Sequence, residues 1–223
     1  MDRFLVFPWE YIPFVFLVLL IAFTLHEFAH AFAADRFGDP TPRSMGRVTL
    51  NPRVHLDVLG TILIFLVGFG WAKPVLVNRG NFKHPRRMSI IVSLVGPLSN
   101  LLVAFVGLTF VYMFAHFGWL EGMNPGVASA VQTFLSLLVY LNIILFLFNL
   151  LPLPPLDGYR ILQELLPTGI RIKLQQYEQW SIFLLLLIVF IPPLYAVTLG
   201  QVFALREPIM AAMGAVLQLI FGP

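Results

Sequence analysis

Long apolar runs separated by short polar segments make up most of the chain. Four of these runs are long enough for a helix to cross the hydrocarbon core of a bilayer, which takes about 20 mostly apolar residues. They are Tyr11–Ala34, Met88–Ala115, Val127–Leu156 and Ser181–Leu205. Two further runs, Val58–Ala72 and Pro208–Pro223, are shorter. The pattern predicts an all-α, multi-pass integral membrane protein and leaves open whether the last run crosses.

Composition supports this prediction and excludes a water-soluble globular protein. Of 223 residues, 59% are apolar and 11% are charged, and the mean hydropathy is +0.87. Soluble domains average about 45–50% apolar and about 25% charged residues. The chain has no cysteine, so disulfide bonds, cysteine metal sites and thiol catalysis are excluded. We expect a single membrane-embedded domain over 1–223, with a core at about 11–165 and a helical extension at about 166–223.

Basic residues predict which loops face the cytoplasm. Lys and Arg gather in residues 35–87 and 157–180, whereas Gly118–Gly126 contains neither. Cytoplasmic loops carry the excess of Lys and Arg, so we expect the two basic parts to be cytoplasmic and Gly118–Gly126 to be outside. This requires Val58–Ala72 not to cross, and we interpret it as a re-entrant or interfacial segment whose glycines fit non-helical backbone. The net charge of +3 is then a topology signal, and no nucleic-acid partner is expected.

Two cytoplasmic segments have the composition of short strands. Arg47–Leu50 is rich in β-formers and ends at an Asn-Pro pair, and Lys73–Asn78 has a β-branched bias. Pro74 cannot donate a hydrogen bond to a sheet, which favours an edge position for the second segment. The sequence therefore predicts a short β-hairpin beside the re-entrant segment.

The strongest chemical signal is His26-Glu27-Phe28-Ala29-His30, inside the first apolar run. Residues four apart share one face of a helix, so both imidazoles can bind one metal ion, with Glu27 beside them to take a proton from a metal-activated water. The alternative is an incidental set of buried polar residues. Three ionisable groups within five residues of a membrane helix are too costly for that interpretation to be preferred.

A catalytic zinc needs three protein ligands and one open position, so a third ligand must come from elsewhere. Asp35 follows the motif closely but lies near the expected helix end. Asp157 is the better candidate, because three prolines before it stop the helix and allow extended backbone to carry a carboxylate into the bundle. The competing interpretation of Asp157 is a turn residue in an Asp-Gly pair.

Three segments together resemble the site-2 protease family of intramembrane zinc metalloproteases. They are His26–His30, Gly96-Pro97-Leu98-Ser99-Asn100, and Asn149-Leu150-Leu151-Pro152-Leu153-Pro154-Pro155-Leu156-Asp157-Gly158. The resemblance covers about residues 15–165 and is closest to the short branch without a PDZ domain. It implies a three-helix catalytic core, one zinc ion per chain held by His26, His30 and Asp157, and Glu27 as the catalytic base. It also implies that Asn149 lies beside the active site.

The resemblance further implies cleavage of a peptide bond within or near a transmembrane segment of a membrane protein, facing the cytoplasm. A helical substrate must unwind first, and an exposed strand edge can pair with the extended chain. We expect Lys73, Val75 and Val77 to bind substrate in this way. Two alternatives use the same residues, namely a membrane metal carrier or sensor and an inactive protease-like scaffold. His55 and Asp57 are interpreted as a solvated loop pair.

Overall fold

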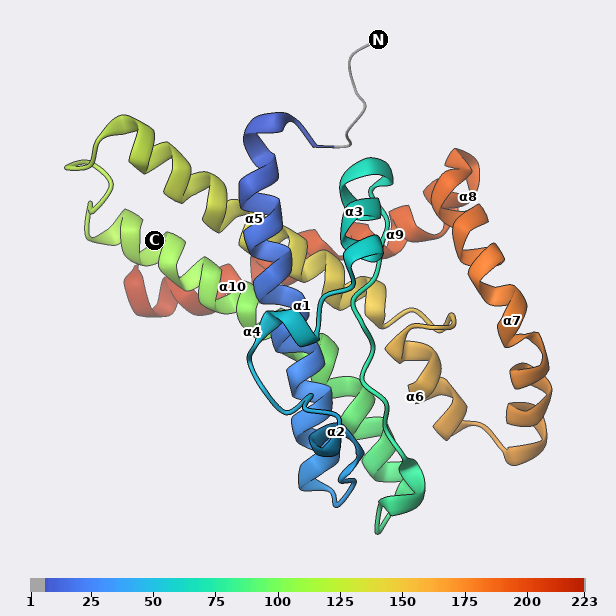
Figure 1. Cartoon of the computed structure of the whole chain (residues 1–223). Helices are drawn as coiled ribbons and strands as arrows, with labels where there is room; N and C mark the ends of the chain where they lie inside the picture. Colours follow the sequence, from blue (N-terminus) through green and yellow to red (C-terminus); the bar gives the residue numbers. More distant parts are fainter. Residues whose placement is uncertain (1–6, 223) are drawn as a thin grey trace.

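The structure, a computed structural model, describes residues 7–222 and is a bundle of helices (Figure 1). The α-helices are α1 (Ile12–Arg36), α2 (Thr41–Ser44), α3 (Val58–Val67), α4 (Pro85–His116), α5 (Pro125–Asn149), α6 (Asp157–Leu165), α7 (Thr168–Phe190), α8 (Pro192–Val197), α9 (Leu199–Ala204) and α10 (Arg206–Phe221). Three short 3₁₀ turns are η1 (Trp9–Tyr11), η2 (Pro52–Val54) and η3 (Arg79–Asn81).

The centre of the bundle is formed by α1, α4 and α5, each of which packs against the other two. Proline at or next to the first residue of each helix fits its start, because the missing N–H would have no partner there. Buried aliphatic side chains such as Val18 of α1 and Leu138 of α5 join the helices. Large apolar side chains such as Leu102 and Phe110 point outward, as suits helices surrounded by lipid.

Within residues 7–222, four helical stretches are long and apolar enough to span a membrane, so the protein is a multi-pass integral membrane protein. Three of them, Trp9–Arg36, Pro85–His116 and Pro125–Asn149, match predicted spans. The fourth is Leu199–Phe221, made of α9 and α10. The prediction of one span at Ser181–Leu205 is wrong, because Pro192 and Pro193 end α7 and start the short helix α8.

The short apolar run forms helix α3, and the chain after this helix returns alongside it. Asp57 caps the start of α3 by accepting a hydrogen bond from Gly60 N–H, and Gly68 ends the helix in the left-handed conformation. Ten residues of helix rise about 15 Å, half of the hydrocarbon thickness. The chain then returns beside α3, where a Cβ on Gly60 would lie 2.2 Å from Trp71 O. The prediction of non-helical backbone is therefore wrong for Val58–Val67.

The predicted β-hairpin is not supported, since residues 7–222 contain no strand. Residues 73–78 run as a drawn-out chain without helix or strand (Figure 1), and side chains take much of their hydrogen bonding. Glu27 accepts from Val75 N–H, Asp39 accepts from Asn78 N–H, and Arg47 donates to Lys73 O. A β-branched composition favours extended backbone, but a strand also needs a partner, and the Arg47–Leu50 segment forms bends instead.

Helix α6 is fixed against the end of α4 by a buried carboxylate. Glu164 pairs with Arg79, and Arg86 at the start of α4 donates to the Glu164 backbone carbonyl. Arg171 of α7 lies 3.7 Å from the second Glu164 carboxylate oxygen. These contacts hold α6, and with it the residue at its first position, Asp157, in a defined place beside α4.

Candidate metal centre

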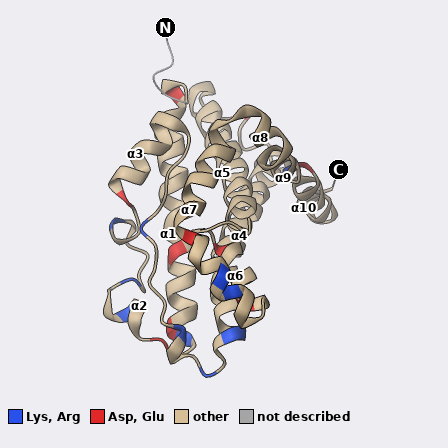
Figure 2. Cartoon of the chain, turned by 90° about the vertical axis from the view of Figure 1, so that its right-hand side faces the viewer, with Lys and Arg blue, Asp and Glu red and all other residues tan. Residues whose placement is uncertain are grey.

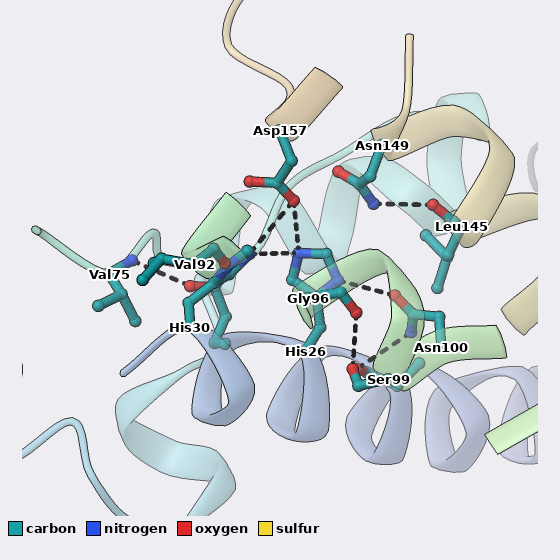
Figure 3. Close-up of polar contacts among 12 residues, drawn as sticks. His26, His30, Val75, Val92, Gly96, Ser99, Asn100, Leu145, Asn149 and Asp157 are labelled. Atoms are coloured by element: carbon teal, nitrogen blue, oxygen red, sulfur yellow. Dashed lines mark hydrogen bonds and ion pairs between the residues drawn. The ribbon is translucent and has the colours of Figure 1, made fainter. Parts of the chain in front are cut away.

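The middle of α1 presents three ionisable side chains to the interior of the bundle. His26, Glu27 and His30 are each less than 10% exposed. Four residues of helix bring the two imidazoles onto one face, and their ring centroids lie 4.6 Å apart. Figure 3 shows both rings projecting from α1 toward Asp157, which comes from the opposite side of the site.

Asp157 completes a group of three converging ligand atoms. Its Oδ2 lies 3.1 Å from His26 Nε2 and 3.2 Å from His30 Nε2. The two Nε2 atoms are 3.0 Å apart. Asp35, the other candidate for the third position, is paired with Arg43 through two bonds of 2.7 Å and belongs to no such group. Tetrahedral zinc with bonds of about 2.0–2.1 Å separates its ligands by about 3.3 Å, so the spacing fits a zinc ion.

The turn after α5 carries Asp157 into position. The helix ends at Asn149, residues 150–156 form turns, and Asp157 opens α6. Gly158 packs so closely on this turn that a Cβ would lie 2.2 Å from Leu150 O.

Hydrogen bonds to the other ring nitrogens fix the tautomers of the two histidines. His30 Nδ1 lies 2.6 Å from the backbone carbonyl of Val92, which can only accept, so His30 Nδ1 carries the proton. His26 Nδ1 lies 2.7 Å from Asn100 Oδ1. Both Nε2 atoms then present lone pairs toward Asp157. Three lone pairs that converge in a buried site favour a cation between them, so this donor set fits a metal ion.

Gly96 of α4 gives the two imidazoles the space they occupy. A Cβ at this position would lie 2.2 Å from His30 Nε2 and 2.9 Å from His26 Cε1. No rotation of the α4 side chain could avoid these atoms, because a Cβ is fixed by the backbone. The sequence pattern contained this glycine, but its contact with the histidines follows only from how α4 packs on α1.

Glu27 points toward the returning segment after α3. Its Oε2 accepts a hydrogen bond of 2.9 Å from Val75 N–H and lies 3.8 Å from Arg47 Nη2. Arg47 in turn donates to Lys73 O. The extended segment expected to bind substrate therefore lies against the carboxylate expected to be the base. Val77, the third residue of that expectation, packs with Ala34 and Phe82.

Two buried residues near Glu27 were not expected from the sequence. Arg47 is 3% exposed and was assigned to a cytoplasmic loop with a topological role. His55 is wholly buried, with Nε2 2.8 Å from Thr49 O, and burial lowers its pKa. The interpretation of His55 and Asp57 as a solvated pair is wrong. In the sequence, Arg47 and His55 differ from other polar residues only by having apolar neighbours. That feature is too common in this chain to predict their burial.

Asn149 lies at the last position of α5, within the turn that leads to Asp157. Its Nδ2 donates to Leu145 O of the same helix over 2.9 Å. Figure 3 shows it on the Asp157 side of the site, above Asn100. Its amide is not part of the three-atom ligand group.

A buried metal-ligand group in a bundle of membrane-spanning helices defines a membrane protein with a candidate metal site, and similar proteins place it among the metalloproteases. The family model described as "Peptidase family M50" matches residues 14–192. A Bacillus subtilis protein named "Putative zinc metalloprotease YwhC" is 46% identical over 219 residues, covering 98% of this chain and 99% of that protein. Proteins named "Putative zinc metalloprotease Rip2" are 33% identical in Mycolicibacterium smegmatis and 31% identical in Mycobacterium tuberculosis. The matches cover 83% and 84% of this chain and 71% of each relative.

The chain therefore belongs to peptidase family M50, the site-2 protease family, and is a membrane zinc metalloprotease. The part of the chain that the structure describes contains no PDZ domain, consistent with the short branch of the family. Zinc is its metal, and His26, His30 and Asp157 form a group that can hold one ion. No solved structure matches the chain.

Proposed function

We propose that the chain is an intramembrane protease that hydrolyses peptide bonds within or near transmembrane segments of other membrane proteins. The observation that carries the proposal is the convergence of His26 Nε2, His30 Nε2 and Asp157 Oδ2 inside the spans, with Glu27 on the same helix. Because His26 and His30 lie in the middle of the α1 span, a substrate segment would reach the site from within the membrane. The family supports a membrane-embedded protein substrate.

In this proposal His26, His30 and Asp157 hold the zinc ion. When bound, zinc acts as a Lewis acid that makes water a strong nucleophile near neutral pH. Glu27 accepts the proton of the attacking water and passes it to the leaving amine, which is general base and then general acid catalysis. Arg47 and Val75 N–H both contact or approach Glu27 Oε2 and hold that oxygen in one orientation.

Asn149 is proposed to assist at the developing oxyanion. An amide N–H directed at the carbonyl oxygen stabilises the negative charge that forms as water adds. Its Nδ2 donates to Leu145 O in the free protein, so substrate has to exchange that bond. Asn149→Ala should lower turnover by about 10²-fold while zinc per chain stays the same. A normal rate would leave Asn149 with a structural role, and loss of folding would indicate a purely structural bond.

Lys73, Val75 and Val77 are proposed to hold the substrate as an extended chain across the site. Unwinding a substrate helix in lipid exposes backbone groups that cost several kcal/mol each unless they are paired. The extended backbone of residues 73–78 offers such pairs by strand addition. Val75 N–H donates to Glu27 here, so substrate binding at that position has to compete with the base for the same N–H.

The active site is proposed to face the cytoplasm. Lys and Arg gather around α2, α6 and the turn before α4, at the lower end of the bundle in Figure 2. The positive-inside rule assigns such an end to the cytoplasm.

The deciding experiment is cleavage of a transmembrane-segment substrate by the purified protein in micelles. Cleavage should be lost with a chelator, restored by zinc, and absent in Glu27→Gln, which keeps the size of the side chain and the zinc. A wild-type protein that binds zinc at these residues but cleaves nothing, with or without added zinc, would be a metal carrier or sensor. A protein with neither zinc nor cleavage would be a scaffold.

A further inference from the structure

A row of buried amides connects α5 to the first histidine of the metal site. Asn142 of α5 and Asn100 of α4 are both wholly buried between the spans. Asn142 Nδ2 donates to Leu138 O over 2.8 Å, and Asn100 Nδ2 donates to Asn142 Oδ1 over 3.0 Å. Asn100 Oδ1 then lies 2.7 Å from His26 Nδ1 (Figure 3). Three helices thus contribute to one hydrogen-bonded row.

The direction of every bond in this row follows from its far end. The Leu138 carbonyl can only accept, so Asn142 must turn its NH₂ toward it and its oxygen toward Asn100. Asn100 must then turn its NH₂ toward Asn142 and its oxygen toward His26. An oxygen at that position accepts, so His26 Nδ1 carries the proton and Nε2 keeps a lone pair for the metal. A longer contact of 3.4 Å from Asn100 Nδ2 to Ala22 O acts in the same direction.

We propose that Asn142 is a positioning residue for the metal site, which sets the tautomer of His26 through Asn100. The inference rests on the proposed role of His26 as a zinc ligand. Asn142 hydrogen-bonds to Asn100 and Leu138 and not to His26 or Asp157, and it lies outside the three segments that carry the family resemblance. The tautomer of His30 does not depend on a side-chain amide, because its Nδ1 contacts a backbone carbonyl directly.

A purely structural role would give different results. Amides that bridge transmembrane helices also stabilise their association. A bridge of that kind would change the stability of the bundle, but zinc affinity of the folded protein would stay the same. Positioning predicts the opposite, since partners of metal-bound histidines typically change metal affinity 10–100-fold.

The test uses the full chain in micelles and measures zinc affinity by competition with a chromophoric chelator. Asn142→Leu removes both ends of the amide at similar size, and its zinc affinity should fall on the order of tenfold. Asn100→Leu should lose at least as much. Thr24→Val is the matched control, because Thr24 is a buried polar residue of α1 whose hydroxyl donates to Leu20 O of its own helix. Wild-type affinity in folded Asn142→Leu would overturn the proposal.

A second measurement does not depend on any variant of Asn142. In zinc-loaded wild-type protein labelled with ¹⁵N-histidine, the ¹⁵N shifts of His26 should show metal on Nε2 and hydrogen on Nδ1. Metal on Nδ1 would overturn the proposal. Unchanged zinc affinity in His26→Ala would overturn both this inference and the proposed ligand set. Absent proteolysis with the expected shifts and affinities would overturn the proposed function but leave the positioning role of Asn142 standing.

Discussion

At the scale of single residues, the site depends on atoms that must lie within about 3 Å of one another. Helical spacing brings His26 and His30 together, but Asp157 is 127 positions beyond His30 in the chain. A carboxylate at that distance along the sequence reaches the histidines only because the turn after α5 and the packing of α6 direct it there. The residue types were evident in the sequence, whereas their convergence is a property of the fold.

The choice between Asp157 and Asp35 as the third ligand can be tested by zinc content. Asp157→Ala should lose most of its zinc, because a site with two ligands binds zinc weakly. Asp35→Ala is the matched control, since Asp35 is paired with Arg43 on the surface and should keep about one zinc per chain. Elemental analysis of the purified proteins measures both. Full zinc and activity in Asp157→Ala would mean that the third ligand lies elsewhere.

Gly96 provides a test of the close approach between α4 and α1. Gly96→Ala places a methyl group 2.2 Å from His30 Nε2, so the ring must move and zinc should be largely lost. Gly107→Ala, in the same helix, meets only flexible side chains at 3.2 Å or more and should keep its zinc. Equal zinc content in the two folded variants would contradict the packing described for α4.

At the scale of elements, the returning segment after α3 shows that a local sequence pattern does not predict strand pairing. The β-branched residues of Lys73–Asn78 predicted a strand, but these residues form neither helix nor strand. The predicted hairpin is absent from the described residues, because the neighbouring Arg47–Leu50 segment bends and Arg47 itself bonds to Lys73 O. Strand pairing needs a partner strand. Here the side chains of Arg47 and Glu27 bond to the backbone groups that a partner strand would have paired with.

The contact between this segment and Glu27 can be tested through one backbone N–H. Val75→Pro removes the donor of the 2.9 Å bond to Glu27 Oε2 and should abolish cleavage of a helical membrane substrate, with zinc content unchanged. Val75→Ala keeps the N–H and should retain most of the activity. If Val75→Pro and Val77→Pro both cleave normally, the segment does not hold the substrate.

At the scale of the whole molecule, the surroundings of the bundle decide what counts as a core. α1, α4 and α5 bury aliphatic, small and polar side chains against one another and expose further large apolar side chains on the outside of the bundle. In water such a surface would drive aggregation, whereas lipid solvates it. Buried polar groups such as His26, Asn100 and Asn142 are then retained where they bond to one another, in the middle of the bundle.

The orientation of the whole molecule can be tested by cysteine labelling, which is simple because the native chain has no cysteine. Glu121→Cys and Gln175→Cys both place a thiol at an exposed position, in the Gly118–Gly126 loop and in α7. We expect a membrane-impermeant reagent added outside to label only the first. Labelling of Glu121→Cys from the cytoplasm alone would reverse the proposed topology.

The sequence by itself determined the features that depend on neighbouring residues. Three of the four spans follow from the length of apolar runs, and the shared face of His26 and His30 follows from helical geometry. The prolines of residues 152–155 and 192–193 mark real breaks between helices, although the length of the apolar run Ser181–Leu205 favoured one span across the second break. Each of these features depends only on residues that lie close together in the sequence.

Only the tertiary structure decided which distant groups meet. The approach of Asp157 to the histidines, the space left by Gly96, the bond from Val75 N–H to Glu27 and the burial of His55 all join residues from separate segments. Such contacts depend on how helices pack and on which polar groups find partners away from water. A one-dimensional pattern contains the residues for these contacts but not the distances between them.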